Sequence, residues 1–138
     1  MQQQITVQTT VDAPMQQVWD YWSLPEHIMQ WNHALDSWHC PFAENDLRVG
    51  GKFRYRMEAK DGTMGFDFEG VYDEVIPFTK ISYTMPDGRR AITTFEDLNG
   101  QIQVTTTFDA EQVNPLQMQK AGWQAILDNF KNYVEMHA

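Results

Sequence analysis

The chain has 138 residues, a formal net charge of −9 at pH 7 and one cysteine, Cys40, which excludes an internal disulfide. This length fits one domain over residues 1–138, and the negative charge disfavours binding to nucleic acids and to anionic membrane surfaces. Because no apolar run approaches the roughly 20 residues that span a bilayer, and the first ten residues do not resemble a signal peptide, we expect a cytoplasmic protein without membrane insertion.

The first third of the chain is predicted to form a strand, two short helices and a second strand. Alternating apolar and polar residues indicate the strands, and a proline at each helix start fits the first helical turn. Asp12 is expected to cap the first helix, which stops near Ser23. The predicted ranges are a strand over 5–11, helices over 13–23 and 25–31, and a strand around 37–42.

The middle of the chain alternates apolar and polar residues in short runs separated by glycine turns, beginning after Gly50-Gly51. Asp61-Gly62 and Asn99-Gly100 are strong hairpin signals, because both residue types of each pair tolerate positive φ. A third turn is expected at Pro86-Asp87-Gly88. The pattern predicts an antiparallel meander with one covered face and strands over 52–59, 65–75, 80–85, 91–96 and 101–109.

After Asn114-Pro115 the apolar period changes to that of a helix. We expect Asn114 to be the N-cap and Pro115 the first helical residue, in a helix roughly 30 Å long that covers the sheet. Strands segregated from helices indicate an α+β fold. The predicted apolar stripe of this helix is Leu116, Trp123, Ile126, Leu127, Phe130 and Val134.

Charged residues alternate with aromatic ones on the predicted hairpin around Asp61-Gly62. One interpretation places the charges across from one another on a solvated outer face, where opposite charges pair. The alternative is a buried carboxylate that acts as a general base, as a cyclase or dehydratase requires, with an arginine stabilising the enolate. The residues concerned are Arg54, Arg56, Glu58, Asp67 and Glu69.

Three histidines and Cys40 fall within fourteen positions and raise the question of a zinc site. Their spacing matches no common ligand motif, so we predict no metal and no cofactor. We interpret Cys40 as a small core residue and expect His33, between Trp31 and Trp38, to lie at the rim of a cavity.

The ordered set of local motifs resembles the SRPBCC superfamily, which includes START lipid-transfer, birch-pollen-allergen and polyketide cyclase proteins. The chain is most similar to the branch related to the C-terminal domain of the activator of heat shock protein 90 ATPase. In place of a tryptophan pair followed by Gly-Pro, this chain has Trp31-Asn32-His33-Ala34. The matching segments are Ala13-Pro14, Val18-Trp19, Pro25-Glu26, Trp31, Asp46-Leu47-Arg48, Gly50-Gly51, Phe53, Asp61-Gly62, Gly70-Val71-Tyr72, Glu74-Val75, Pro77, Ile81-Ser82-Tyr83-Thr84, Thr94-Phe95 and Gly122-Trp123.

The resemblance implies a helix-grip fold, a curved sheet of about seven strands wrapped on the C-terminal helix. It also implies that a small hydrophobic or amphipathic molecule, such as a lipid, binds between them. Gly70 and Gly122 remove side-chain volume there, although Gly122 could instead allow close contact between helix and sheet. The residues expected to line the cavity are Trp22, Trp31, His33, Trp38, Tyr55, Met57, Phe66, Phe68, Tyr83, Phe95, Trp123 and Leu127.

Two alternatives remain beside ligand binding. A chaperone-ATPase regulator would bind protein through a contiguous exposed apolar patch. A cyclase or dehydratase would direct a carboxylate or histidine into the cavity, and no catalytic residue is assigned from the sequence. The exposed strand edges also permit a homodimer.

Overall fold

The computed structural model describes residues 3–137 and arranges them as seven strands and three helices. All predicted elements are present, and their ends agree with the sequence patterns to within three residues. In chain order they are β1 (Gln4–Val11), α1 (Met15–Ser23), α2 (Pro25–Trp31), β2 (Trp38–Asn45), β3 (Lys52–Ala59), β4 (Gly65–Ile76), β5 (Lys80–Thr84), β6 (Arg90–Asp97), β7 (Ile102–Asp109) and α3 (Leu116–Met136).

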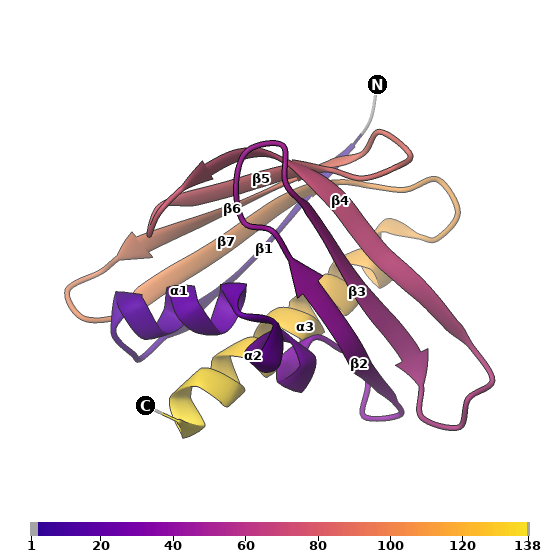
Figure 1. Cartoon of the computed structure of the whole chain (residues 1–138), viewed down its shortest axis with the longest axis horizontal. Coiled ribbons are helices and arrows are strands. Elements are labelled where there is room, and N and C mark those ends of the chain that lie inside the picture. The colour runs from indigo at the N-terminus through magenta and orange to yellow at the C-terminus, as the bar shows by residue number, and fades with distance from the viewer. Residues whose placement is uncertain (1–2, 138) are drawn as a thin grey trace.

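Strands β2 to β7 form an antiparallel meander, and β1 adds to the edge of the sheet beside β7. Their order in the sheet is β1-β7-β6-β5-β4-β3-β2, and every pair of neighbours is antiparallel. Figure 1 shows the sheet arching over α3, with α1 and α2 beside the C-terminal half of that helix. This arrangement confirms the predicted α+β helix-grip fold.

The hairpin turns form where the sequence predicts them. Gly62, Gly88 and Gly100 all have positive φ, as does Asn99 at 60°. These left-handed conformations are strained for most side chains but open to glycine and tolerable for asparagine. The turns therefore set the antiparallel register of the strands that they join.

Alternation along the strands separates a buried inner face from an exposed outer one. On β7, Ile102, Val104 and Phe108 are each 1% exposed or less, as is Phe130 on α3. Fully burying an apolar side chain of this size stabilises the fold by roughly 1.5–3 kcal/mol. The main core thus lies between the inner face of the sheet and the three helices.

Both predicted helix caps are wrong in detail. The N-cap of α1 is Pro14 rather than Asp12, and that of α3 is Pro115 rather than Asn114, with no side-chain cap bond in either case. A proline side chain has no acceptor, so it contributes by fixing its own backbone. Asp12 instead links the segment before α1 to the C-terminal end of α3, since its backbone N–H donates to Glu135 Oε2 at 2.9 Å.

The first turn of α3 also differs from the predicted stripe. Leu116 is 42% exposed, while Gln119 is buried. The Gln119 amide donates to the Asn114 carbonyl at 2.8 Å, and its oxygen accepts from the Glu111 backbone N–H at 2.8 Å. A polar side chain is therefore turned inward to fix the loop between β7 and α3. No helix formed by residues 3–137 has the length and apolarity needed to cross a membrane.

The free edge of β1 is covered by polar side chains of α3. Gln124 Nε2 donates to the Gln8 carbonyl at 3.0 Å, and Lys131 Nζ donates to the Thr10 carbonyl at 2.6 Å. Unpaired strand carbonyls are sites where another strand can add. Covering them hinders strand addition at β1, and the predicted homodimer stays a prediction.

Gly70 and Gly122 occupy opposite packing environments. A Cβ at Gly70 would lie 2.8 Å from the Phe53 ring and 3.0 Å from the Thr84 carbonyl oxygen. A Cβ at Gly122 would have no neighbour within 4 Å. The alternative of close helix–sheet contact at Gly122 is therefore wrong, and the close contact in fact occurs at Gly70, beneath Phe53.

This contrast predicts opposite effects of the same substitution. Gly70→Ala should lower the free energy of unfolding by about 1–3 kcal/mol, because the added methyl overpacks against Phe53. Gly122→Ala should raise it by about 0.5–1 kcal/mol, because alanine favours the helix and no contact opposes it. Urea denaturation of both variants measures the difference, and effects of the same sign would contradict the assignment.

Candidate functional site

A cavity of about 200 Å³ lies between the inner face of the sheet and α3. Its walls come from six strands, β1 and β3 to β7, and from α3, together with residues at the ends of α1 and α2. The residues that line it are Val7, Trp22, Trp31, Asn32, Phe53, Tyr55, Met57, Phe66, Phe68, Tyr72, Ile81, Tyr83, Thr93, Thr106, Trp123, Ile126 and Leu127.

The sheet side of the cavity is built from cross-strand aromatic pairs. The register places Tyr55 opposite Phe68 and Tyr72 opposite Tyr83. Phe53 lies among them over Gly70, with ring centroids 4.8–5.3 Å from those of Tyr55, Tyr72 and Tyr83. Tilted and edge-on contacts of this kind hold the rings in place. The sheet wall is therefore largely preformed.

The helix side is fixed at two places along α3. Trp123 stacks on Phe108, with ring centroids 3.8 Å apart and planes 9° from parallel. Seven residues later, Phe130 packs edge-on against Trp22 and Trp31, with ring centroids 5.0 and 4.9 Å apart. Ile126 and Leu127 lie between these two contacts and face the cavity.

Half-exposed Phe66 marks the opening of the cavity. Its side chain lines the cavity and is also 50% exposed. Trp38 lies beside it, with ring centroids 6.0 Å apart. The mouth therefore opens near the β3–β4 hairpin.

Several polar groups along the walls already have protein partners. The hydroxyls of Thr93 and Thr106 lie 2.8 Å apart, and Trp31 Nε1 donates to the Tyr21 carbonyl at 2.9 Å. Groups satisfied in this way offer a cavity occupant few further hydrogen bonds.

A hydrogen-bond chain leads from the sheet wall to the end of α1. The Tyr72 hydroxyl donates to Asn45 Oδ1, and Tyr55 lies close enough to Tyr72 for its ionisation to be affected. Asn45 Nδ2 in turn donates to the Ser23 carbonyl at 2.7 Å. The hydroxyls of Tyr55 and Tyr83 and the side-chain amide of Asn32, which also line the cavity, take part in none of the hydrogen bonds found among the described side chains.

Burial keeps the cavity tyrosines protonated. It raises the pKa of Tyr72 to about 12, and it raises the pKa of Tyr55 and of Tyr83 as well. The neighbouring Tyr72 raises the pKa of the other two further. All three hydroxyls are therefore neutral at physiological pH.

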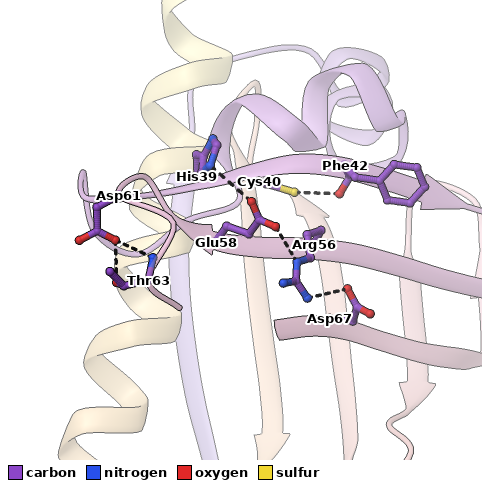
Figure 2. Close-up of polar contacts among 8 residues, drawn as sticks. All are labelled: His39, Cys40, Phe42, Arg56, Glu58, Asp61, Thr63 and Asp67. Atoms are coloured by element: carbon purple, nitrogen blue, oxygen red, sulfur yellow. Dashed lines mark hydrogen bonds and ion pairs between the residues drawn. The ribbon is translucent and has the colours of Figure 1, made fainter. Parts of the chain in front are cut away.

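The charged residues of the β3–β4 hairpin lie on the outer face of the sheet, as the first interpretation predicts. Figure 2 shows a row of polar contacts across three strands, formed in order by His39, Glu58, Arg56 and Asp67. Arg56 Nε lies 2.9 Å from Glu58 Oε2, and Arg56 Nη1 lies 3.5 Å from Asp67 Oδ1. Solvent-exposed pairs of this kind add little to stability.

Among residues 3–137, no Asp, Glu, Lys, Arg or His lines the cavity. A cyclase or dehydratase mechanism requires a carboxylate or histidine beside its substrate. The buried-carboxylate interpretation of the hairpin is therefore wrong.

The histidines do not converge with Cys40. His27 Nδ1 lies 2.7 Å from the Tyr133 hydroxyl, on the far side of α2, and His39 faces Glu58 on the outer sheet. Within the described part of the chain, no three His, Cys, Asp or Glu residues are grouped as metal ligands would be. Burial raises the pKa of Cys40 to about 11, so its thiol stays protonated, as in a core residue.

Nine of the twelve residues predicted to line a cavity do so. These are Trp22, Trp31, Tyr55, Met57, Phe66, Phe68, Tyr83, Trp123 and Leu127. Of the other three, Trp38 lies beside Phe66, and His33 adjoins Asn32 with its carbonyl accepting from Asn129 Nδ2 at 2.5 Å. Phe95 is buried behind the cavity against Trp19 and Trp22. The role of the twelve in binding stays a prediction.

Eight lining residues were not predicted. The inward-facing Thr93 and Thr106 follow the same alternation as their buried neighbours, so the strand pattern could have identified them. Asn32 ends a short helix and has no such signal. The others are Val7, Phe53, Tyr72, Ile81 and Ile126.

The raised tyrosine pKa values predict loss of stability at alkaline pH. From pH 10, the ordinary tyrosine pKa, the unfolded chain loses these protons while the folded protein retains them, so rising pH favours unfolding. Removing one such group with Tyr83→Phe should reduce the slope by at most about 1.4 kcal/mol per pH unit above pH 10. Urea denaturation between pH 9 and 11.5 measures this slope. Ile81→Val, on the same strand, is the control and should leave the slope unchanged.

Comparisons with known proteins agree with this architecture. The family model described as Activator of Hsp90 ATPase homolog 1-like protein matches residues 12–135. A comparison with curated proteins found no match.

Among solved structures, the AHSA1-like protein from Aeromonas hydrophila is 41% identical, with a TM-score of 0.92 over 98% of this chain and 94% of that one. Chr148 from Cytophaga hutchinsonii is 47% identical, with a TM-score of 0.84 over 97% and 93%. Protein CV1439 from Chromobacterium violaceum, 23% identical with a TM-score of 0.85 over 96% of each chain, shares the fold. The chain therefore belongs to the family of proteins like the activator of Hsp90 ATPase homolog 1.

Proposed function

We propose that this protein binds a small hydrophobic or amphipathic molecule in the cavity between the sheet and α3. The observation that carries the proposal is a cavity of about 200 Å³ with predominantly apolar and aromatic walls. Pockets for small molecules in proteins are typically of this character, with a few placed polar groups.

The size of the cavity supports a compact ligand. An engineered apolar cavity of about 150 Å³ holds benzene, so this one accommodates a molecule of one or two rings. Its walls are held by contacts among the wall residues themselves, such as Phe53 on Tyr83. A preformed site requires little ordering of the protein when the ligand enters.

The family and its fold are consistent with ligand binding. A lipid or another amphipathic molecule would place its apolar part inside and its polar end near Phe66. The rim role of His33 and Trp38 belongs to this proposal, and so do the cytoplasmic location and the possible homodimer.

The chaperone-regulator alternative rests on the family's name and stays a prediction. It requires a contiguous apolar patch. The large apolar side chains that are exposed in the described residues are spread over the sheet, α3 and the loops, with Phe66, Val71 and Ile76 on β4 and Leu116, Met118 and Met136 on α3. The apolar cavity is the more specific observation, so ligand binding is the better supported function.

Filling the cavity should abolish binding without unfolding the protein. The neutral two-ring probe 6-propionyl-2-(dimethylamino)naphthalene fluoresces more strongly on entering apolar sites, and we expect it to bind the unmodified protein. Ile126→Trp places a large side chain in the cavity and should remove the fluorescence increase. Lys120→Trp, exposed on the same helix, should leave it unchanged.

Equal fluorescence of the two variants would place the probe outside the cavity and contradict the proposal. Native mass spectrometry of protein purified without denaturation complements the test. A reproducible extra mass that is lost on denaturation would identify a natural occupant, and the same spectrum reports the oligomeric state.

A further inference from the structure

The polar groups of the cavity limit the chemistry of the ligand. No residue with a formal charge lines it within residues 3–137, and the three tyrosines there are neutral. An ionised group taken out of water without an opposite charge carries a large desolvation penalty. An anionic or cationic ligand group placed inside would therefore have no counter-charge.

The nearest candidate for a counter-charge is already paired. Arg89 lies close enough to Tyr83 to act on its ionisation, and it belongs to the β5–β6 turn. Its Nε donates to Asp87 Oδ2 at 2.7 Å. With that carboxylate beside it and a net charge of −9 on the chain, Arg89 gives little attraction to a buried anion.

The hydrogen-bond donors of the walls differ in availability. Trp31 donates to the Tyr21 carbonyl, the two threonines share a bond, and Tyr72 donates to Asn45. The Tyr55 hydroxyl lies close enough to Tyr72 to be affected by it, but within residues 3–137 it takes part in no hydrogen bond, and neither do the Asn32 side-chain amide and the Tyr83 hydroxyl. Tyr83 packs edge-on against Phe68, with ring centroids 6.1 Å apart, and burial favours its neutral form.

Polar groups in a protein interior nearly always have a hydrogen-bond partner, and the Tyr83 oxygen retains accessible surface where one can bind, since it is not among the fully buried, unpartnered side-chain atoms of the described residues. Because Tyr83 lines the cavity, the open space beside it is where such a partner can sit. A neutral hydroxyl with a free proton donates to an acceptor, such as a carbonyl or ether oxygen.

We infer that the ligand is an uncharged, ring-containing molecule whose hydrogen-bond acceptor is bound by the Tyr83 hydroxyl. This inference rests on the proposed function and specifies the ligand class of the same cavity. The flat walls formed by Phe68 and Trp123 suit the faces of a ring, and the volume limits it to one or two rings.

Three probes with one ring system test the inference. 2-Acetylnaphthalene is neutral with a carbonyl acceptor, 2-naphthoate is anionic at pH 7, and 2-isopropylnaphthalene is neutral without an acceptor. Each is titrated into the full chain, and NMR follows the Met57 methyl and Trp123 indole signals. We expect the ketone to bind at least about tenfold more tightly than the carboxylate, because only the carboxylate must bury a charge.

Tyr83→Phe should weaken binding of the ketone by about 3- to 10-fold, the effect of one hydrogen bond, and leave the hydrocarbon unaffected. Tyr133→Phe, which removes a hydroxyl outside the cavity, is the matched control and should change neither. A nuclear Overhauser contact between the acetyl methyl group and the Tyr83 ring in the unmodified protein provides the same assignment without a substitution.

The outcomes separate the inference from the proposed function. Naphthoate binding as tightly as the ketone would overturn the requirement for a neutral ligand. Equal binding of ketone and hydrocarbon, with no effect of Tyr83→Phe, would overturn the role of Tyr83. In both cases the cavity signals still move, and the proposed function stands. If no probe moves the Met57 or Trp123 signals, the proposed function fails together with the inference.

Discussion

The cavity depends on how α3 is held against the sheet. Trp123 stacks on Phe108, and Phe130 packs against the paired indoles of Trp22 and Trp31. Two turns of helix, about 10 Å, separate these contacts. Large rings at both ends hold the helix away from the sheet between them, where Ile126 and Leu127 are too small to fill the gap. An enclosed space follows from side-chain size.

The same helix completes the sheet. Its polar side chains Gln124 and Lys131 bond to free carbonyls of β1, the strand at one edge. The helix thus covers the inner face with its apolar stripe and the edge with its flank. Covering the sheet and covering its edge use different sides of α3. The helix is therefore amphipathic, but its polar side includes residues that bond to β1.

Polar chemistry is divided between the two faces of the sheet. Charged pairs such as Arg56 with Asp67 lie outside, in water, where ions cost little. Inside, neutral hydroxyls replace them, and most are bonded to one another or to backbone, as Thr93 is to Thr106. Among the described residues that line the cavity, the Tyr55 and Tyr83 hydroxyls and the Asn32 side-chain amide take part in no such bond. Because the cavity walls formed by residues 3–137 carry hydroxyls but no charged side chains, they favour the binding of neutral molecules.

Local sequence patterns determined the elements of this protein, because period and turn chemistry are properties of neighbouring residues. Alternation placed β3 at residues 52–59, and Asn99-Gly100 marked the turn between β6 and β7, since positive φ at such a site is a local requirement. The outward charges on β3 and β4 could be predicted for the same reason. The caps of α1 and α3 were missed by two residues and one residue, because proline competes with Asp12 in the first case and with Asn114 in the second for the same few positions.

Only the tertiary structure decided what faces the cavity and what lies behind it. Phe95 and Phe68 have the same strand pattern, yet Phe95 packs behind Trp22 while Phe68 faces the open space. Gln119 is buried and Leu116 exposed because the loop before α3 needs hydrogen bonds more than it needs apolar contact. The sequence alone determines which side of an element is covered. The depth and shape of the space beneath it depend on distances between side chains from strands and helices far apart in the chain.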